Sequence, residues 1–245
     1  MVLGRQKGRG MVDMHCHILP EIDDGSRNME ETMIMLKMAA ASGIEAMIVT
    51  PHYKKGRHNA DPDTVIECMD MVREAARRRN INIPLYPGNE LFYFSGAEEA
   101  VEKGEILTLN HTDRILIEFS PCETFFYIRN ALEGLRGIGC VPVIAHVERY
   151  ECLLKDHTRM EELKQMDTEI QINASSIAGA AGYGIKKFVH RLLKEQMVDY
   201  VGTDAHDAKK RTPEAKKVIG QLYKKYDAGY VDAILYENAL ALLGA

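Results

Sequence analysis

Short runs of apolar residues recur along the chain, and most of them end in a polar or charged residue. Seven of these runs have the length and the branched side chains that are typical of buried strands. They are Met11–His17, Ala46–Pro51, Ile83–Leu91, Asp113–Phe119, Val141–His146, Glu169–Ala174 and Asp199–Thr203.

Apolar residues at helical spacing fill the gaps between the predicted strands. Asn28–Ser42 has this spacing, and Asp61 followed by Pro62 predicts the start of a helix that includes Val65–Arg79. A last helix is predicted over Tyr230–Leu243. Strands that alternate with helices form parallel sheets through right-handed crossovers, so the pattern predicts either an open doubly wound α/β sheet or a closed (β/α) barrel.

Candidate metal ligands lie at the ends of six of the seven predicted strands and distinguish between these two folds. Because side chains alternate along a strand, Asp13, His15 and His17 are expected on one face of the first. The further candidates at strand ends are His52, Glu90, Glu118, His146, Asp204 and His206, whereas the sixth strand ends without an ionisable side chain. All strands of a barrel end on the face that carries the active site, so this distribution favours the closed barrel.

The residue types at these strand ends favour metal binding over a purely structural role. A single histidine after an apolar strand is usually a hydrogen-bonded structural residue. Five histidines and three carboxylates at six strand ends are harder to explain by packing, because buried charged groups are costly unless they are paired or metal-bound. Such a mixed ligand set suits manganese, iron or zinc. The remaining histidines, His58, His111, His157 and His190, are expected to be solvated or structural.

Two aspartates lie in the turn-rich loop after the first strand. Asp23 is expected to be a turn or helix-capping residue, because that is the common use of the sequence Asp-Asp-Gly-Ser. For Asp24 the residues alone leave both this role and a metal-ligand role open.

Composition and charge narrow the class of protein. With 245 residues and 46% hydrophobic residues, the chain is predicted to form one domain over residues 11–245, after a disordered extension of residues 1–10. The net charge of −5, without a stripe of Lys and Arg, argues against general nucleic-acid binding. No run of residues is long and apolar enough to insert into a membrane, so a cytoplasmic location is expected.

The five cysteines do not indicate disulfide or thiol chemistry. They are odd in number and include no Cys-x-x-Cys pair, so free thiols are expected. None has an arginine six positions later, as a cysteine phosphatase would require. Strand alternation also directs Cys16 away from the candidate ligands on either side of it.

Several short motifs resemble those of one known superfamily. They are His15-Cys16-His17, Asp24-Gly25, Thr50-Pro51-His52, Gly88-Asn89-Glu90, Ile117-Glu118-Phe119, Ala145-His146-Val147-Glu148-Arg149-Tyr150 and Asp204-Ala205-His206. Together they resemble the polymerase and histidinol phosphatase (PHP) superfamily. Within it the chain is most similar, from about Met11 to its C-terminus, to the bacterial capsular and exopolysaccharide metal-dependent protein-tyrosine phosphatases of the CpsB, CapC and YwqE type.

This resemblance implies a distorted (β/α)7 TIM-like barrel, the PHP fold, that holds three divalent metal ions, often Mn²⁺. By similarity, the first metal would be held by His15, His17, Glu90 and Asp204. Glu90 would bridge to a second metal held by Glu118 and His146, and the third would be held by Asp24, His52 and His206.

Two arginines are implied to bind phosphate by the same resemblance. The planar guanidinium groups of Arg149 and Arg211 match a pair of phosphate oxygens. Without the resemblance, Arg211 is equally well explained as a surface residue ahead of Thr212 and Pro213.

The implied activity is that of a metal-dependent protein-tyrosine phosphatase, in which hydroxide formed at the metals attacks phosphotyrosine. The implied partner is the tyrosine-rich tail of a bacterial tyrosine kinase of polysaccharide synthesis and export. Two alternatives stay open: a histidinol-phosphate phosphatase or other PHP phosphoesterase, and a non-catalytic regulatory PHP module. The aromatic segments Phe92-Tyr93-Phe94 and Phe125-Phe126-Tyr127 either pack the fold or line the pocket mouth, where they would favour an aromatic leaving group.

Overall fold

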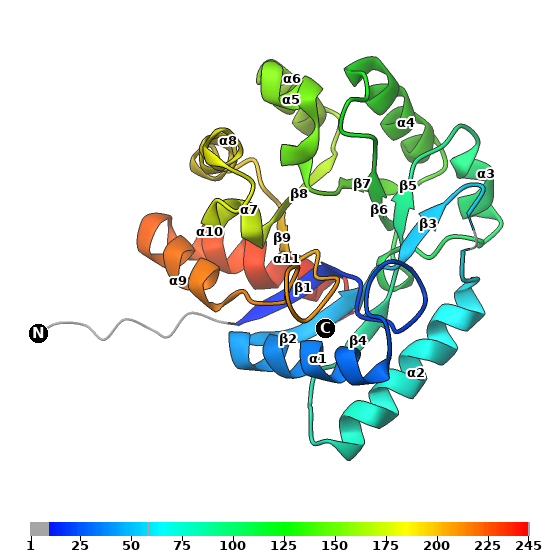
Figure 1. The fold of residues 1–245 in the computed structure, drawn as a ribbon. Coiled ribbons are helices and arrows are strands. Elements are labelled where there is room, and N and C mark those ends of the chain that lie inside the picture. The colour runs from blue at the N-terminus through cyan, green and yellow to red at the C-terminus, as the bar shows by residue number, and fades with distance from the viewer. Residues whose placement is uncertain (1–9, 58, 245) are drawn as a thin grey trace, which may run out of the picture.

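A computed structural model describes residues 10–57 and 59–244, in which helices and parallel strands alternate around a ring (Figure 1). Residues 1–9, nearly all of the predicted N-terminal extension, lie outside the described residues, as does His58. The strands are β1 Met11–Cys16, β2 Ile44–Val49, β3 His52–Lys54, β4 Leu85–Pro87, β5 Glu90–Phe92, β6 Arg114–Glu118, β7 Val141–Ile144, β8 Glu169–Asn173 and β9 Tyr200–Gly202.

The strands pair in parallel within two sheets, ordered β1-β2-β4 and β3-β5-β6-β7-β8-β9. The predicted strand Ile83–Leu91 is wrong as a single element, because β4 and β5 are separated at Gly88 and Asn89. Here the Asn89 side chain replaces ladder bonds: it donates to the carbonyl oxygen of Pro51 and accepts from the amide of Leu107. These two side-chain hydrogen bonds keep the backbone groups of Pro51 and Leu107 paired where the strand is interrupted.

The interruptions join the two sheets into one wall. The predicted strand Ala46–Pro51 is likewise continued, beyond Thr50 and Pro51, by the short strand β3. Because β2 pairs with β4 and β3 pairs with β5, each interrupted strand belongs to both sheets.

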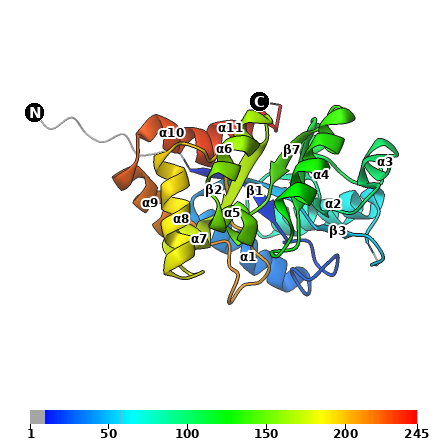
Figure 2. The same ribbon diagram turned by 90° about the horizontal axis from the view of Figure 1, so that it is seen from above.

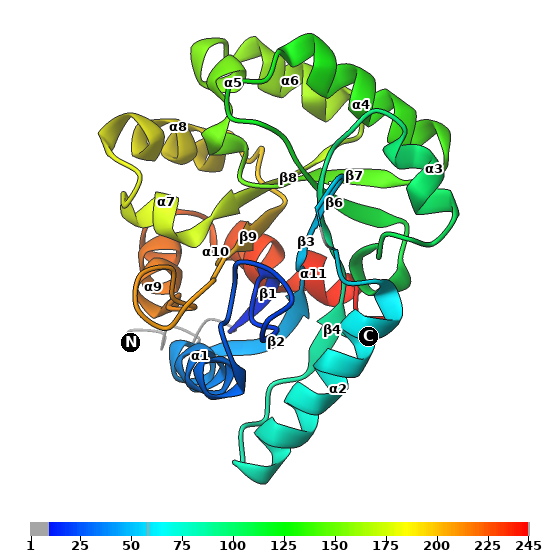
Figure 3. The ribbon, with the colours of Figure 1, turned by 45° about the vertical axis from the view of Figure 1, so that its right-hand side comes forward.

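The ring closes between β9 and β1. The amide of Asp204 donates to the carbonyl oxygen of His15 at 2.8 Å, and the amide of His17 donates to that of Ala205 at 2.8 Å. With each interrupted strand counted once, seven strands surround the barrel, and the prediction of a distorted (β/α)7 barrel is confirmed (Figure 3). All strand C-terminal ends therefore meet at one mouth.

Helices cover the outside of this barrel (Figure 2). They are α1 Met29–Ser42, α2 Pro62–Arg78, α3 Ala97–Glu102, α4 Phe125–Gly137, α5 Glu151–Lys155, α6 Thr158–Gln165, α7 Ala174–Ala178, α8 Tyr183–Lys194, α9 Lys216–Lys225, α10 Ala228–Asp232 and α11 Asn238–Ala241. The short 3₁₀ segments η1 and η2 span Leu109–His111 and Val147–Arg149, and the π-helical segment η3 spans Ala233–Glu237. None of the helices described is long and apolar enough to cross a membrane.

Capping side chains set two helix starts near the predicted positions. The Asn28 side chain accepts from the amide of Glu31, so Asn28 caps α1 instead of starting it. The Asp61 side chain accepts from the amide of Thr64, and Pro62 is the first residue of α2, as predicted. The single helix expected over Tyr230–Leu243 is instead divided among α10, η3 and α11.

Candidate metal centre

All nine predicted metal ligands lie together at the mouth of the barrel. Their ligand atoms form four overlapping groups in which every atom lies within 4.8 Å of the others. These groups are His17-Asp24-His52-His206, His15-Glu90-His146, His15-His17-Asp204 and His52-Glu90-Glu118. Six of the seven barrel strands, at their ends or interruptions, and the loop after β1 therefore supply one continuous cluster at the mouth of the barrel.

Glu90, the first residue of β5, occupies the middle of this cluster. One carboxylate oxygen lies 2.8 Å from Nε2 of His146 and 3.3 Å from Nε2 of His15. The other lies 3.3 Å from Nε2 of His17 and 2.9 Å from Nδ1 of His52. A carboxylate between four imidazoles has the position required of a bridging ligand.

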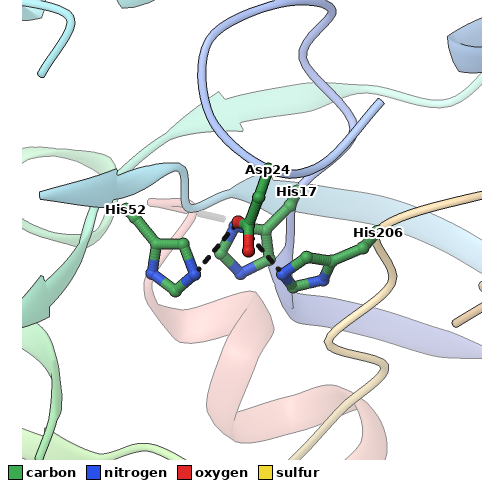
Figure 4. A group of neighbouring side chains, drawn as sticks. All are labelled: His17, Asp24, His52 and His206. Carbon is green, nitrogen blue, oxygen red and sulfur yellow. Dashed lines mark ion pairs between the residues drawn. The ribbon is translucent and has the colours of Figure 1, made fainter. Parts of the chain in front are cut away.

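The outer part of the cluster is formed around Asp24. Its carboxylate lies 3.3 Å from Nε2 of His52 and 3.6 Å from Nε2 of His206 (Figure 4). The rings of His17 and His206 have centroids 3.9 Å apart. Asp24 is exposed, whereas His17 and His206 are buried, so this group faces the solvent side of the centre.

Two hydrogen bonds fix the orientation of the first two histidines. Nδ1 of His15 lies 3.2 Å from Oε1 of Gln171, and Nδ1 of His17 lies 2.7 Å from Oδ2 of Asp23. Since carboxylate and amide oxygens only accept, each Nδ1 carries a proton, and once a ring is neutral its lone pair lies on Nε2. The two Nε2 atoms lie 3.2 Å apart, an arrangement that a shared cation would stabilise.

Asp23 has a role that the sequence analysis missed. It is a turn residue as predicted, because Oδ1 accepts from the amide of Gly25 at 2.9 Å. In addition, Oδ2 accepts from Nδ1 of His17 and from the amide of His52. The carboxylate therefore orients one candidate ligand directly and holds the backbone of a second.

The sixth predicted strand, β8, also contributes, although it has no ionisable candidate at its end. Oε1 of Gln171 accepts from the amide of His146 at 2.7 Å as well as from His15. Two residues further along the same strand, Asn173 donates to Oδ2 of Asp204 at 2.8 Å and accepts from Nε2 of Gln171. The period of two in this pair, Gln171 and Asn173, was the available signal.

Asp204 lies between the two predicted phosphate-binding arginines. Arg149 pairs with its Oδ2 atom, and Nη2 of Arg211 lies 2.7 Å from Oδ1. Asp204 and His146 both have positive φ angles, 53° and 34°, and each lies two residues beyond the end of its strand. Non-glycine residues in this region carry backbone strain, which often occurs at functional sites.

A close approach by β9 holds His15 in place. A Cβ atom on Gly202 would lie 2.7 Å from Cβ of His15 and 2.9 Å from Nε2 of Gln171. Only glycine leaves room for the imidazole and the amide that orients it.

The carboxylates of the cluster alter the protonation of the histidines. Burial opposes protonation of His17, but the charge and hydrogen bond of Asp23, together with those of Glu90, outweigh it and raise the pKa of His17 to about 10. Burial also opposes protonation of His52, yet hydrogen bonds with Glu118 and Glu90 raise its pKa to about 9. The cluster thus attracts positive charge strongly, whether as protons or as metal cations.

The available donor atoms fit divalent cations. Burial and the neighbouring His17 lower the pKa of His206 to about 3, so its ring is neutral and can coordinate a metal. The buried atom Nε2 of His206 makes no hydrogen bond. Buried polar atoms without partners are costly, and a cation would supply the missing interactions.

The cysteines remain outside this chemistry. All five are free, as predicted. The Cys16 thiol points into the packing layer and donates to the carbonyl oxygen of Ile48, and burial raises its pKa well above the usual range. A thiolate nucleophile is therefore not provided at Cys16.

Most rings of the two aromatic segments pack against the fold. Tyr93 donates to Glu98 at 2.8 Å and meets Tyr127 edge to face, with ring centroids 5.5 Å apart. Phe94 and Phe125 pack against the core, whereas Phe126 is exposed. Two of the remaining predicted structural histidines are also hydrogen-bonded away from the cluster: His157 pairs with Glu195, and His190 pairs with Tyr226.

Comparison with known proteins identifies the family of this chain. Residues 11–244 match the family model described as capsular polysaccharide synthesis, CpsB/CapC. The tyrosine-protein phosphatase YwqE of Bacillus subtilis is 32% identical, covering 95% of this chain and 91% of its own length. The tyrosine-protein phosphatase CpsB of Streptococcus pneumoniae is 31% identical, covering 93% of this chain and 96% of its own.

A solved structure extends the similarity to the whole barrel. It comes from work on YwqE of Bacillus subtilis and CpsB of Streptococcus pneumoniae, described as unique metal-dependent tyrosine phosphatases, and it superimposes with a TM-score of 0.89 at 32% identity. It covers 96% of this chain and 94% of the matched chain. These findings confirm the family resemblance, and the chain belongs to the CpsB/CapC family of capsular polysaccharide synthesis.

Proposed function

We infer that this chain is a metal-dependent protein-tyrosine phosphatase that hydrolyses phosphotyrosine at the mouth of its barrel. The observation that carries this inference is the convergence of nine imidazole and carboxylate ligands beside two arginines. Family membership supports the reaction class, since the relatives are tyrosine-protein phosphatases.

We assign the ligands to three divalent cations, with Mn²⁺ as the proposed metal. By the family resemblance, the first set is His15, His17, Glu90 and Asp204; the second is Glu90, Glu118 and His146; the third is Asp24, His52 and His206. The four groups of neighbouring ligand atoms contain the same nine residues but divide them differently. The central position of Glu90 supports its role as a bridge. Carboxylates and imidazoles suit Mn²⁺, and iron and zinc remain alternatives for the same donors.

The protein side chains have separate tasks in this reaction. Bound divalent cations supply an activated water molecule and offset negative charge on phosphate oxygens. Arg149 and Arg211, now paired with Asp204, would turn their guanidinium groups to the phosphate and bind its oxygens. Gln171 and Asp23 hold His15 and His17 with their Nε2 lone pairs facing the centre.

The proposed partner is a phosphotyrosine protein, namely the tyrosine-rich tail of a bacterial tyrosine kinase of polysaccharide synthesis or export. The family description connects the chain to capsular polysaccharide synthesis. We further propose a cytoplasmic location, where such a tail and its kinase domain would be accessible.

The test is a parallel assay of three substrates with Mn²⁺ present: a phosphotyrosine peptide, the matching phosphoserine peptide and histidinol phosphate. We expect kcat/KM to be highest for the phosphotyrosine peptide. A preference of about tenfold for histidinol phosphate, equivalent to about 1.4 kcal/mol, would instead assign the chain to the histidinol-phosphate branch.

The ligand-set variants His15→Ala and Asp204→Ala separate catalysis from folding. Both should lose phosphatase activity and bind less metal while keeping the circular dichroism spectrum of the parent. Weak metal binding together with no turnover by the parent protein would indicate a non-catalytic regulatory module.

A further inference from the structure

A cavity of about 620 Å³ opens beside the candidate metal centre. Its walls come from α1, α7, the loop after β9 and the start of α9, which Figures 1 and 3 show on one side of the barrel mouth. Arg149, Asp204 and Arg211 all line it, so it is continuous with the proposed phosphate site. The volume lies within the range of about 300–1,000 Å³ that is usual for ligand sites.

The apolar part of the cavity is built mainly from small side chains. Ala41 of α1 faces it together with Ala174 and Ala178 of α7, and the longer side chains are Met38 and Val218. Among the described residues that line it, none belongs to either aromatic segment. The space next to the phosphate site therefore has room for a peptide side chain.

The rim of the cavity is strongly basic. In addition to the two arginines, its lining includes Lys210, Lys216 and Lys217. Among the described residues that line it, the acidic ones are Asp204 and Glu214. The chain as a whole carries a net charge of −5, so this concentration of cations is local. Among the described ion pairs, none involves one of these three lysines.

The loop after β9 fixes part of this rim relative to the metal centre. The amide of the proposed ligand His206 donates to the carbonyl oxygen of Arg211 at 2.8 Å. The Asp207 side chain accepts from the amides of Lys209 and Lys210, both at 2.6 Å. Lys210 and Arg211 are thus presented by a turn that is hydrogen-bonded to the site itself.

We propose that this cavity binds the peptide segment next to the phosphotyrosine and selects segments that carry negative charge there. This inference rests on the proposed phosphatase function and adds a specificity site to it. The arginines would bind the phosphate that is removed, while Lys210, Lys216 and Lys217 pair with charges on flanking residues. Such charges come from Asp or Glu, or from a second phosphorylated tyrosine nearby.

The experiment uses three phosphotyrosine peptides that differ only within two positions of the phosphotyrosine. One carries Glu at these positions, one carries Gln, and one carries a second phosphotyrosine among Gln residues. We expect kcat/KM for the Glu peptide and the doubly phosphorylated peptide to exceed that for the Gln peptide by roughly tenfold, from several exposed charge pairs. The difference should shrink at high ionic strength.

A double variant, Lys216→Ala with Lys217→Ala, tests the assignment to the cavity. It should lose most of the preference while keeping the parent rate on p-nitrophenyl phosphate, which has no flanking chain. Lys103→Ala is the control, because Lys103 is an exposed lysine that directly follows α3, and Figure 1 shows α3 on the opposite side of the barrel from α7 and α9. It should keep the full preference.

Two outcomes would overturn the inference: equal rates on all three peptides, or a double variant that keeps the parent preference. A preference for the doubly phosphorylated peptide alone would restrict the ligand to a second phosphate. If no peptide is hydrolysed, the phosphatase proposal fails. The cavity is then tested separately, by equilibrium binding of the matching non-hydrolysable phosphonate peptides to the metal-loaded protein, where the Glu peptide should bind about tenfold more tightly than the Gln peptide.

Discussion

The side-chain oxygen of Gln171 lies 3.2 Å from Nδ1 of His15, on a strand whose end carries no ionisable candidate. The same oxygen accepts from the amide of His146, so one neutral side chain fixes the ring of one proposed ligand and the backbone of another. Groups that orient a ligand through its second ring nitrogen determine which nitrogen faces the metal.

Replacement of Gln171 should therefore weaken metal binding without removing a ligand. Gln171→Ala is expected to lower the affinity for Mn²⁺ by about 10- to 100-fold, because His15 loses its fixed tautomer and orientation. Isothermal titration of metal-free protein measures this directly. Gln165→Ala, at an exposed position on α6, is the control. An unchanged affinity in Gln171→Ala would show that packing alone orients His15.

The ligands at the strand ends could be predicted from the sequence, whereas the interruption of one strand could not. Imidazoles and carboxylates after apolar runs are rare as packing residues, so His52, Glu118 and His146 could be grouped without coordinates. The strand break at Gly88 and Asn89 could not be predicted, since it depends on side-chain bonds to Pro51 and Leu107, which are distant in the sequence.

Orienting residues were harder to identify than candidate ligands. Gln171 and Asn173 are neutral amides, and only their spacing of two residues distinguishes them from other polar residues at a strand end. Asp23 was assigned to a turn, which is correct, but its second carboxylate oxygen reaches His17 only because the loop folds back over the barrel mouth. Such dual use depends on tertiary structure.

The two arginines should act on the reaction rather than on metal binding. Arg149→Ala and Arg211→Ala are each expected to lower kcat/KM by about 10²- to 10³-fold, the usual effect of removing one transition-state donor. Lysine at either position should restore activity only in part, because it cannot form a bidentate pair with phosphate. Metal content measured beside the rates should stay at the parent level. A variant with parent kcat/KM would leave that arginine with a structural role.

Gly202 offers a steric test of the centre. In Gly202→Ala the new methyl group would meet Cβ of His15 at 2.7 Å, so the histidine or the strand must shift. We expect a loss of about 1–3 kcal/mol in unfolding free energy, together with weaker metal binding. Gly220→Ala in α9 is the matched control, because a Cβ there meets nothing within 4 Å and alanine favours the helix. If Gly202→Ala is as stable as the parent and binds metal equally well, the close approach of β9 to His15 is not needed for stability or metal binding.

Protons and metals should compete for His17. Burial opposes protonation of His17, but its interactions with Asp23 and Glu90 together raise its pKa to about 10, from a usual value of 6.5, so in the metal-free protein this ring is protonated at neutral pH. Its protonation stabilises the metal-free fold fully below pH 6.5, and this contribution is lost as the pH rises through about 10.

Coordination requires the neutral ring, so metal uptake at neutral pH should release about one proton or more, and the apparent affinity for the metal should increase with pH. Calorimetric titration with Mn²⁺ in two buffers of different ionisation enthalpy counts these protons. In Asp23→Asn the count should fall, because the main cause of the raised pKa is removed. Metal binding without proton release in the parent protein would show that the metal does not displace a proton from His17.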